Sequence, residues 1–233
     1  MLKIAFAGNP NVGKTALINE IAGSKLKVGN WPGVTVEKKE AQFTYENEEI
    51  FLIDLPGVYS LSPYSNEEII TRDYIINENP DLIINVVDAT NLERNLYLTA
   101  LLKELGKPMI IALNLYDEFK KLDYRLDEKQ FEEFFGLNIV KTSARTREGL
   151  EDLLKKAIAM SKEKEKTNFK LHFNSTIDKE VEAIKKEISD KEEFKPVLEK
   201  LSLDYLAVKL LEEDKHLIDV LKNDYKISDV SFT

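Results

Sequence analysis

The sequence contains no cysteine among its 233 residues, and only two histidines and one tryptophan. Without cysteine the chain can form no disulfide and offers no thiolate ligand to a metal, which fits a reducing compartment. No uninterrupted apolar run approaches the roughly 20 residues of a membrane-spanning helix, so we expect the chain as given to be soluble. An apolar run that follows Met1 almost at once leaves no room for a signal peptide.

The sequence also lacks an excess of positive charge: 42 acidic residues outnumber 33 lysines and arginines, and the formal net charge is -9. A surface that binds nucleic acid would be basic, so we predict no nucleic-acid partner. This balance still allows one small anion to bind at a local site. The length suggests one large domain, or one domain followed by a smaller one, with enough residues to bury a core.

Apolar, strand-like runs alternate with helix-like stretches as far as about residue 160. The expected strands are 3–8, 36–45, 49–54, 82–88, 108–114 and 138–141, and the expected helices are 14–22, 65–76, 92–104, 127–135 and 148–160. This alternation is typical of an α/β fold with helices on both faces of a parallel sheet. The link of residues 46–48 is short enough to require a hairpin, so one strand should run antiparallel. We therefore predict a mixed, mostly parallel six-stranded sheet.

The composition changes at the charged run 161–166, where we place a domain boundary near Lys166. Beyond this point the strand signal disappears, and apolar residues recur at helical spacing, with Ser175 as a candidate N-cap. The predicted organisation is a nucleotide-binding domain over residues 1–166 and a small all-helical domain over 167–233.

The segment Gly8–Thr15 fits the phosphate-loop pattern G-x-x-x-x-G-K-[ST] and lies between a predicted strand and a predicted helix. Backbone N–H groups of such a loop surround an anion, and the helix N-terminus adds partial positive charge. Lys14 would reach the β- and γ-phosphates, and the Thr15 hydroxyl would ligate Mg²⁺. The predicted nucleotide-binding residues of this region are Gly8, Asn9, Asn11, Val12, Gly13, Lys14, Thr15 and Ala16.

Two further positions complete the phosphate end of the predicted site. Asp54 ends an apolar strand and begins the pattern D-x-x-G, which places a carboxylate where it can hold Mg²⁺. Gly57 would let its backbone N–H approach the γ-phosphate. Thr35 lies in a loop between these motifs, where a threonine hydroxyl would bind the metal when the γ-phosphate is present.

The run Asn114-Leu115-Tyr116-Asp117 follows another apolar strand and resembles the guanine-reading N-x-x-D motif of the translation-factor class of GTPases. The Asp117 carboxylate can accept two parallel hydrogen bonds from guanine, whereas adenine lacks that donor pair. Leu115 stands where a lysine is usual. Ser143 and Ala144 resemble the S-A-[KR] loop whose backbone contacts the guanine carbonyl.

In these motifs taken together, the chain resembles the ferrous iron transport protein B family. The resemblance rests on Gly8–Thr15, on residues 30–37 and 54–61, and on 64–68 with 72–74; the helical tail around 206–212 is similar to the small helical domain of that family. It implies a Ras-like P-loop NTPase fold and a cytosolic GTP-binding portion, which binds GTP or GDP and lies on the cytoplasmic face of the inner membrane. The partner would be the membrane-spanning part of the same full-length protein, which passes Fe²⁺, while a homo-oligomer stays open.

The implied mechanism is slow GTP hydrolysis, with Lys14, Asn11, Thr35 and Gly57 as its catalytic residues and Mg²⁺ as cofactor. Val58 stands where many GTPases have a glutamine that orients the attacking water, so another group must help. The resemblance offers Asn11 as a ligand of K⁺, with carbonyl groups near Gly29 and Trp31 completing the shell. Residues 28–37 and 57–72 would be the switch segments, and the helical domain would sense them.

Two alternatives remain open from the sequence. A ribosome-assembly or RNA-associated GTPase uses the same nucleotide motifs, although it would predict a basic appended domain. A nucleotide-dependent interaction module with negligible turnover would also be consistent with Val58.

Overall fold

The computed structural model describes residues 1–62, 64–163, 175–228 and 230. The chain divides into two compact units. The first contains Met1–Lys103 and continues from Lys107, and the second contains Glu104–Gly106 together with the described residues from Ser175 onward. The predicted boundary near Lys166 lies outside the described residues. No helix in the described part of the chain is both long and apolar enough for a membrane crossing.

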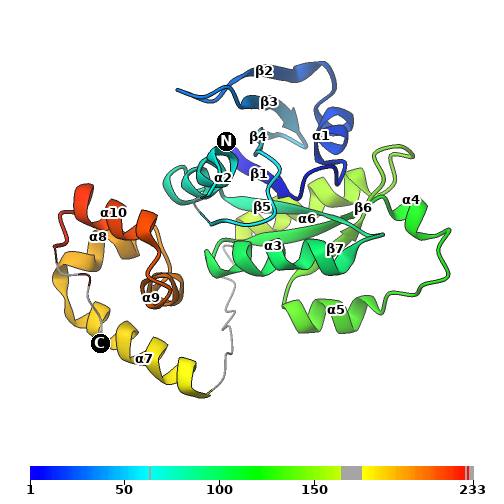
Figure 1. Cartoon of the computed structure of the whole chain (residues 1–233). Helices are drawn as coiled ribbons and strands as arrows, with labels where there is room; N and C mark the ends of the chain where they lie inside the picture. Colours follow the sequence, from blue (N-terminus) through cyan, green and yellow to red (C-terminus); the bar gives the residue numbers. More distant parts are fainter. Residues whose placement is uncertain (63, 164–174, 229, 231–233) are drawn as a thin grey trace. The chain divides into compact units, whose positions relative to one another are not determined.

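The first unit is built on one mixed sheet in the order β2-β3-β4-β1-β5-β6-β7 (Figure 1). The strands are β1 (Leu2–Gly8), β2 (Leu26–Asn30), β3 (Glu37–Tyr45), β4 (Glu48–Asp54), β5 (Leu82–Asp88), β6 (Met109–Asn114) and β7 (Asn138–Lys141). The five strands β4, β1, β5, β6 and β7 pair in parallel, and β3 pairs antiparallel with both β2 and β4. The mostly parallel sheet is thus confirmed, but six strands was wrong, because β2 forms from a segment that we expected to be part of a loop.

The central strands are apolar almost without interruption because both faces of the sheet are covered. On one face, Ile4 and Phe6 of β1 pack into a core cluster with Leu17 of α1 (Lys14–Ala22) and Leu153 of α6 (Leu150–Glu163). Toward the other face, Asn85 of β5 donates a 2.6 Å hydrogen bond to the Thr99 hydroxyl of α3 (Leu92–Glu104). The sheet is therefore fixed from both sides, and its carboxyl edge can hold loops in place.

The remaining helices of this unit are α2 (Asn66–Asn77), α4 (Tyr116–Phe119), α5 (Glu128–Phe135) and the single 3₁₀ turn η1 (Gly23–Lys25). α2 begins with a capping box, in which the Ser65 hydroxyl accepts from the Glu68 backbone N–H and the Glu68 carboxylate accepts from that of Ser65, both at 3.2 Å. Asp127 is the N-cap of α5, and its side chain accepts a hydrogen bond from the Gln130 backbone N–H in the first turn. The five predicted helices of this unit are present, with ends shifted by at most a few residues.

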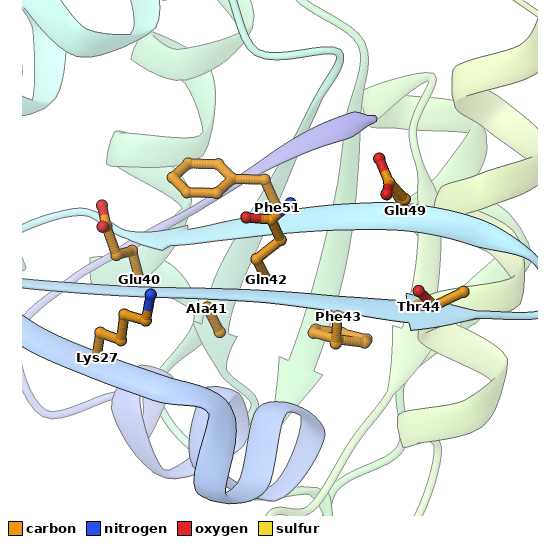
Figure 2. Close-up of a pocket in the computed structure, with 8 residues that line it drawn as sticks. All are labelled: Lys27, Glu40, Ala41, Gln42, Phe43, Thr44, Glu49 and Phe51. Carbon is orange, nitrogen blue, oxygen red and sulfur yellow. The ribbon is translucent and has the colours of Figure 1, made fainter.

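The β3–β4 hairpin turns at Glu46 and Asn47, which both have positive φ, at 47° and 67°. This is the conformation of a two-residue turn that matches the strand twist. Figure 2 shows the alternation along β3, where Glu40 and Gln42 lie on one side with Phe51 while Ala41 and Phe43 point to the other. These residues of β3, with Lys27 of β2 and Glu49 and Phe51 of β4, line a hollow of about 370 Å³. None of the predicted site residues lies in it, so this hollow is separate from the predicted nucleotide site.

The second unit is all-helical in its described part, as predicted. Its elements are α7 (Ser175–Asp190), η2 (Glu192–Phe194), α8 (Lys195–Leu198), α9 (Leu203–Leu211) and α10 (Lys215–Asn223). α7 packs along α9, and Ile188, Phe194 and Leu206 are fully buried. The Ser202 and Asp214 side chains cap α9 and α10 by accepting hydrogen bonds from the N–H groups of Tyr205 and Leu217. Spacing and capping in the sequence therefore suffice to define these helices.

Candidate functional site

The predicted site residues gather at one edge of the sheet, where the parallel strands end. Gly8 is the last residue of β1, Asp54 of β4 and Asn114 of β6, and Thr142 follows β7 directly (Figure 1). In open α/β sheets this carboxyl edge is where ligands bind. Motifs far apart in the sequence are therefore placed side by side by the register of the sheet.

The phosphate loop depends on two glycines for steric reasons. Gly13 has φ of 79° at the N-cap of α1, and a Cβ there would lie 2.5 Å from Asn114 Nδ2. A Cβ on Gly8 would lie 2.5 Å from the Val86 carbonyl oxygen of β5. Both positions exclude a side chain, so the loop backbone can pack closely against the ends of β5 and β6 and present its N–H groups at the start of α1.

Lys14, Asp54 and Thr15 form one buried polar cluster. The Lys14 ammonium donates to Asp54 Oδ1 and, at 2.6 Å, to the Leu55 carbonyl oxygen. The Thr15 hydroxyl donates to Asp54 Oδ2 at 2.7 Å. Burial lowers the pKa of Lys14, while the Asp54 carboxylate acts in the opposite direction. These hydrogen bonds connect Lys14, which would bind phosphate, to the Asp54 carboxylate and the Thr15 hydroxyl, the two oxygen ligands expected to hold Mg²⁺.

Gly57 is required because the chain passes very close to the phosphate loop. A Cβ at this position would lie 3.0 Å from Pro10 Cα and 3.1 Å from Pro10 N. The next residue, Val58, donates its backbone N–H to the Gly8 carbonyl oxygen at 3.2 Å, and its side chain is buried. Gly57 therefore lies beside the phosphate loop, while the Val58 side chain is buried in the core.

A cavity of about 400 Å³ lies next to the phosphate loop. Its lining includes seven of the predicted residues: Gly13, Ala16, Asn114, Leu115, Asp117, Ser143 and Ala144. Asn19, Glu20, Glu118 and Arg145 also line it but were absent from the predicted set. Asn19 and Glu20 follow Ala16 at the helical spacing of three and four residues, which could have identified them.

Asn114 connects this cavity to the phosphate loop. Its side-chain NH₂ donates to the Val12 carbonyl oxygen at 2.9 Å, and its side-chain oxygen accepts from the Thr142 hydroxyl at 3.3 Å. All three residues are buried. The asparagine of the N-x-x-D motif thus fixes the two loops relative to each other.

Asp117 presents its carboxylate to the cavity from the first turn of α4. Leu115 precedes that turn in the left-handed region at φ of 58°, which turns the chain sharply at the end of β6. The Ser143 hydroxyl holds the pKa of Asp117 below its usual range, burial opposes this, and Arg145 adds to the lowering. The carboxylate is thus ionised at neutral pH and suited to accept hydrogen bonds from paired N–H donors.

Several predicted residues are not drawn into these clusters. Thr35 is exposed in the turn between β2 and β3. Asn11 is exposed with φ of 65°, and no hydrogen bond in the described part of the chain joins it to Gly29 or Trp31. The Asn9 side chain donates to the Arg94 carbonyl oxygen at 3.2 Å, so it faces α3. The roles of Thr35, Asn11 and Asn9 in nucleotide binding stay predictions.

The phosphate-loop motif between β1 and α1, at the carboxyl edge of a mostly parallel sheet, places this chain in the P-loop class of GTP-binding domains. Comparison with known proteins then identifies the particular family. Residues 2–157 match the family model described as "Ferrous iron transport protein B", and the chain belongs to this family. It corresponds to the N-terminal G domain, followed by helices.

Individual relatives agree with this assignment. The chain is 47% identical over 222 residues to the Fe(2+) transporter FeoB of Methanocaldococcus jannaschii, covering 95% of this chain and 32% of the relative. Solved structures of the cytosolic domain of the T. maritima FeoB iron transporter, in GMPPNP form and in GDP form, are each 38% identical. They superpose with TM-scores of 0.89 and 0.87, covering 99% of this chain and 88% of theirs. The chain thus spans about a third of the full-length archaeal relative.

Proposed function

We propose that this chain is the guanine-nucleotide switch of a ferrous iron transporter: it binds GTP with Mg²⁺, hydrolyses it slowly to GDP and phosphate, and regulates Fe²⁺ uptake through a membrane-spanning part outside this sequence. The observation that carries the proposal is the meeting of Lys14, Asp54 and Asp117 at one sheet edge. The relatives support the proposal in two ways. The M. jannaschii relative is described as an Fe(2+) transporter, and the solved structures of the T. maritima cytosolic domain include a GDP form and a GMPPNP form. The chain would then lie at the cytoplasmic face of the membrane.

The phosphate end fits a magnesium ion by the chemistry of its donors. The Thr15 hydroxyl and the Asp54 carboxylate are hard oxygen ligands 2.7 Å apart, which suits Mg²⁺ held directly or through water. When bound, the metal neutralises charge that develops on the phosphate oxygens. Lys14 would exchange its bond to Asp54 for the β- and γ-phosphates, and the loop N–H groups would hold the chain of phosphates in line.

Slow turnover follows from Val58, because a buried valine can neither orient nor deprotonate water. We propose that Asn11 compensates by holding a monovalent cation against the phosphates, where it would do the electrostatic work of an arginine. The Asn11 side chain is exposed at the tip of the phosphate loop and has no hydrogen-bond partner in the described residues. Equal hydrolysis rates in K⁺ and Na⁺ buffers, or an unaffected Asn11→Ala variant, would contradict this role.

Trp31, in the first proposed switch segment, contacts Tyr74 in the last turn of α2, a helix that begins within the second proposed switch segment. Its ring meets that of Tyr74 in α2 edge-on, with centroids 5.5 Å apart, and the Lys38 ammonium lies 5.5 Å from the Trp31 centroid. We propose that the turn bearing Thr35 and helix α2 therefore move together when the γ-phosphate is bound or lost. Because Trp31 is the one tryptophan in the sequence, its fluorescence reports on this contact directly.

The switch is tested by recording Trp31 emission with GDP and with GMPPNP, both with Mg²⁺. We expect two distinct spectra, and we expect Tyr74→Ala to remove most of the difference while both nucleotides still bind. Superimposable spectra in the unaltered chain would contradict coupled motion of the two segments.

The function as a whole is tested by calorimetric titration with GDP, GMPPNP and ATP, followed by phosphate release over hours. We expect guanine nucleotides to bind, a large excess of ATP not to displace them, and phosphate release to be slow but measurable. Absence of binding would remove the proposed function. Binding without any phosphate release would favour the second candidate, a nucleotide-dependent interaction module, which the buried Val58 supports.

A further inference from the structure

Arg145 holds the base-reading carboxylate from the solvent side of the cavity. Its Nε donates to Asp117 Oδ2 at 2.8 Å, its Nη2 donates to the same oxygen, and Nη2 also lies 2.9 Å from Glu118 Oε1. The Asp117 side chain is 10% exposed and that of Arg145 is 63% exposed. The Asp117 carboxylate therefore lies inside the site, and the Arg145 guanidinium holds its Oδ2 atom from the solvent side.

The charge balance of the cavity makes this contact important. Among the described residues that line it are three carboxylates, those of Glu20, Asp117 and Glu118, and one cation, Arg145. Leu115, at the position before Tyr116 and Asp117, contributes no charge. The positive charge at the base end of the site therefore comes from the loop after β7 rather than from the N-x-x-D segment.

A second arginine of the same loop provides a comparison. Arg147 Nη1 lies 2.7 Å from Glu20 Oε2 of α1, so it ties the loop to the opposite wall of the cavity. Among the ion pairs of the described residues, Arg147 pairs with neither Asp117 nor Glu118. Arg145 and Arg147 thus hold the loop at both sides, but only one of them acts on the carboxylate that would meet guanine.

We propose that Arg145 is a specificity-determining positioning residue, which fixes the orientation of the Asp117 carboxylate and so sharpens the preference for a purine carrying a 2-amino group. The inference rests on the proposed guanine-nucleotide site. Two N–H groups of one planar guanidinium hold Oδ2, which restricts rotation of the carboxylate before the ligand arrives. A carboxylate that is already oriented loses less conformational freedom when the base binds. It therefore increases the affinity for a base with two parallel N–H donors more than for a base with one.

The test compares dissociation constants for GDP and IDP, which differ only in the 2-amino group, in the unaltered chain and in Arg145→Ala, Arg145→Lys and Arg147→Ala. For Arg145→Ala we expect GDP affinity to fall about fivefold, as for loss of an exposed ion pair, with a smaller loss for IDP, so that the GDP-to-IDP preference narrows. Arg145→Lys keeps the charge but loses the paired donors, so it should lie between. Arg147→Ala removes the same charge from the same loop and should leave the preference unchanged.

Three results would overturn the inference: a GDP-to-IDP preference that is unchanged in Arg145→Ala, a gain in GDP affinity that would show Arg145 competing with guanine, or an equal narrowing of the preference in Arg147→Ala. Thermal unfolding of each variant separates these results from loss of the fold. Failure of the unaltered chain to bind GDP at all would instead remove the proposed function, so the two failures are distinguishable.

Discussion

The phosphate end and the base end of the proposed site are built in different ways. At the phosphate end, Lys14 and Asp54 are buried, and the loop is shaped by backbone packed against neighbouring strands. At the base end, Asp117 is held by Ser143 and by the largely exposed Arg145, both from the loop after β7. The difference teaches that charge recognition here is part of the core, whereas base recognition is supported by side chains on a surface loop. Changes should therefore cost most at the phosphate end and should tune binding at the base end.

The largest effect is expected from Lys14→Ala. This change removes the cation that would meet the β- and γ-phosphates and leaves the buried Asp54 carboxylate without its paired charge. We expect GDP affinity to fall about 100-fold or more, measured by calorimetry with Mg²⁺. Lys27→Ala, which removes an exposed lysine of β2, should leave affinity unchanged. If Lys14→Ala bound GDP almost normally, the phosphate end would not be the stronger anchor.

A smaller but more selective effect is expected from Asp117→Asn. An amide offers one acceptor and one donor group in place of two acceptors, so it mismatches the two N–H groups of guanine. We expect GDP affinity to fall about 30-fold, with xanthosine diphosphate favoured instead because its 2-position carries a carbonyl oxygen. Competition between the two nucleotides measures this, with Asp123→Asn, an exposed aspartate, as control. An unaltered preference for GDP would show that Asp117 does not read the base.

Gly57→Ala tests the close approach of the segment after β4 to the phosphate loop. The added Cβ must displace Pro10 main-chain atoms by a few tenths of an ångström, which shifts the N–H groups on the γ-phosphate side. We expect hydrolysis to slow about tenfold while GDP, which lacks the γ-phosphate, binds within about twofold of normal. Equal losses in both measurements would mean that the glycine supports the fold rather than the reaction.

The smallest effect is a pH shift in Ser143→Ala. The Ser143 hydroxyl is the largest cause of the lowered pKa of Asp117, so its removal raises that pKa toward the usual value. Only the ionised carboxylate accepts both guanine N–H groups, and a lowered pKa keeps it ionised until the medium is more acidic. GDP affinity, followed as the pH falls from about 6 to about 3, should therefore begin to fall at a higher pH in the variant. Curves that differ by a constant factor at every pH would contradict this explanation.

The sequence predicted most of the fold because most elements have a local signal. Apolar runs such as β5 and β6 are recognisable from composition alone, and Ser65 and Asp127 mark helix starts through their caps. β2 was missed because its residues are mostly exposed and include Gly29, so its period is weak, and it becomes a strand through pairing with β3. The short α4 was missed because it follows a left-handed Leu115, a conformation that leucine rarely adopts.

In the candidate site, too, some residues are predictable from local sequence patterns and other contacts are not. The phosphate loop, Asp54 and the N-x-x-D residues are determined by the sequence, because their chemistry requires particular residue types at fixed spacing in the chain. The contacts of Arg145 with Asp117, of Arg147 with Glu20 and of Trp31 with Tyr74 join residues with no local pattern between them. Only the register of the sheet and the packing of helices on it decided these contacts, because partners distant in the chain meet only once the core has formed.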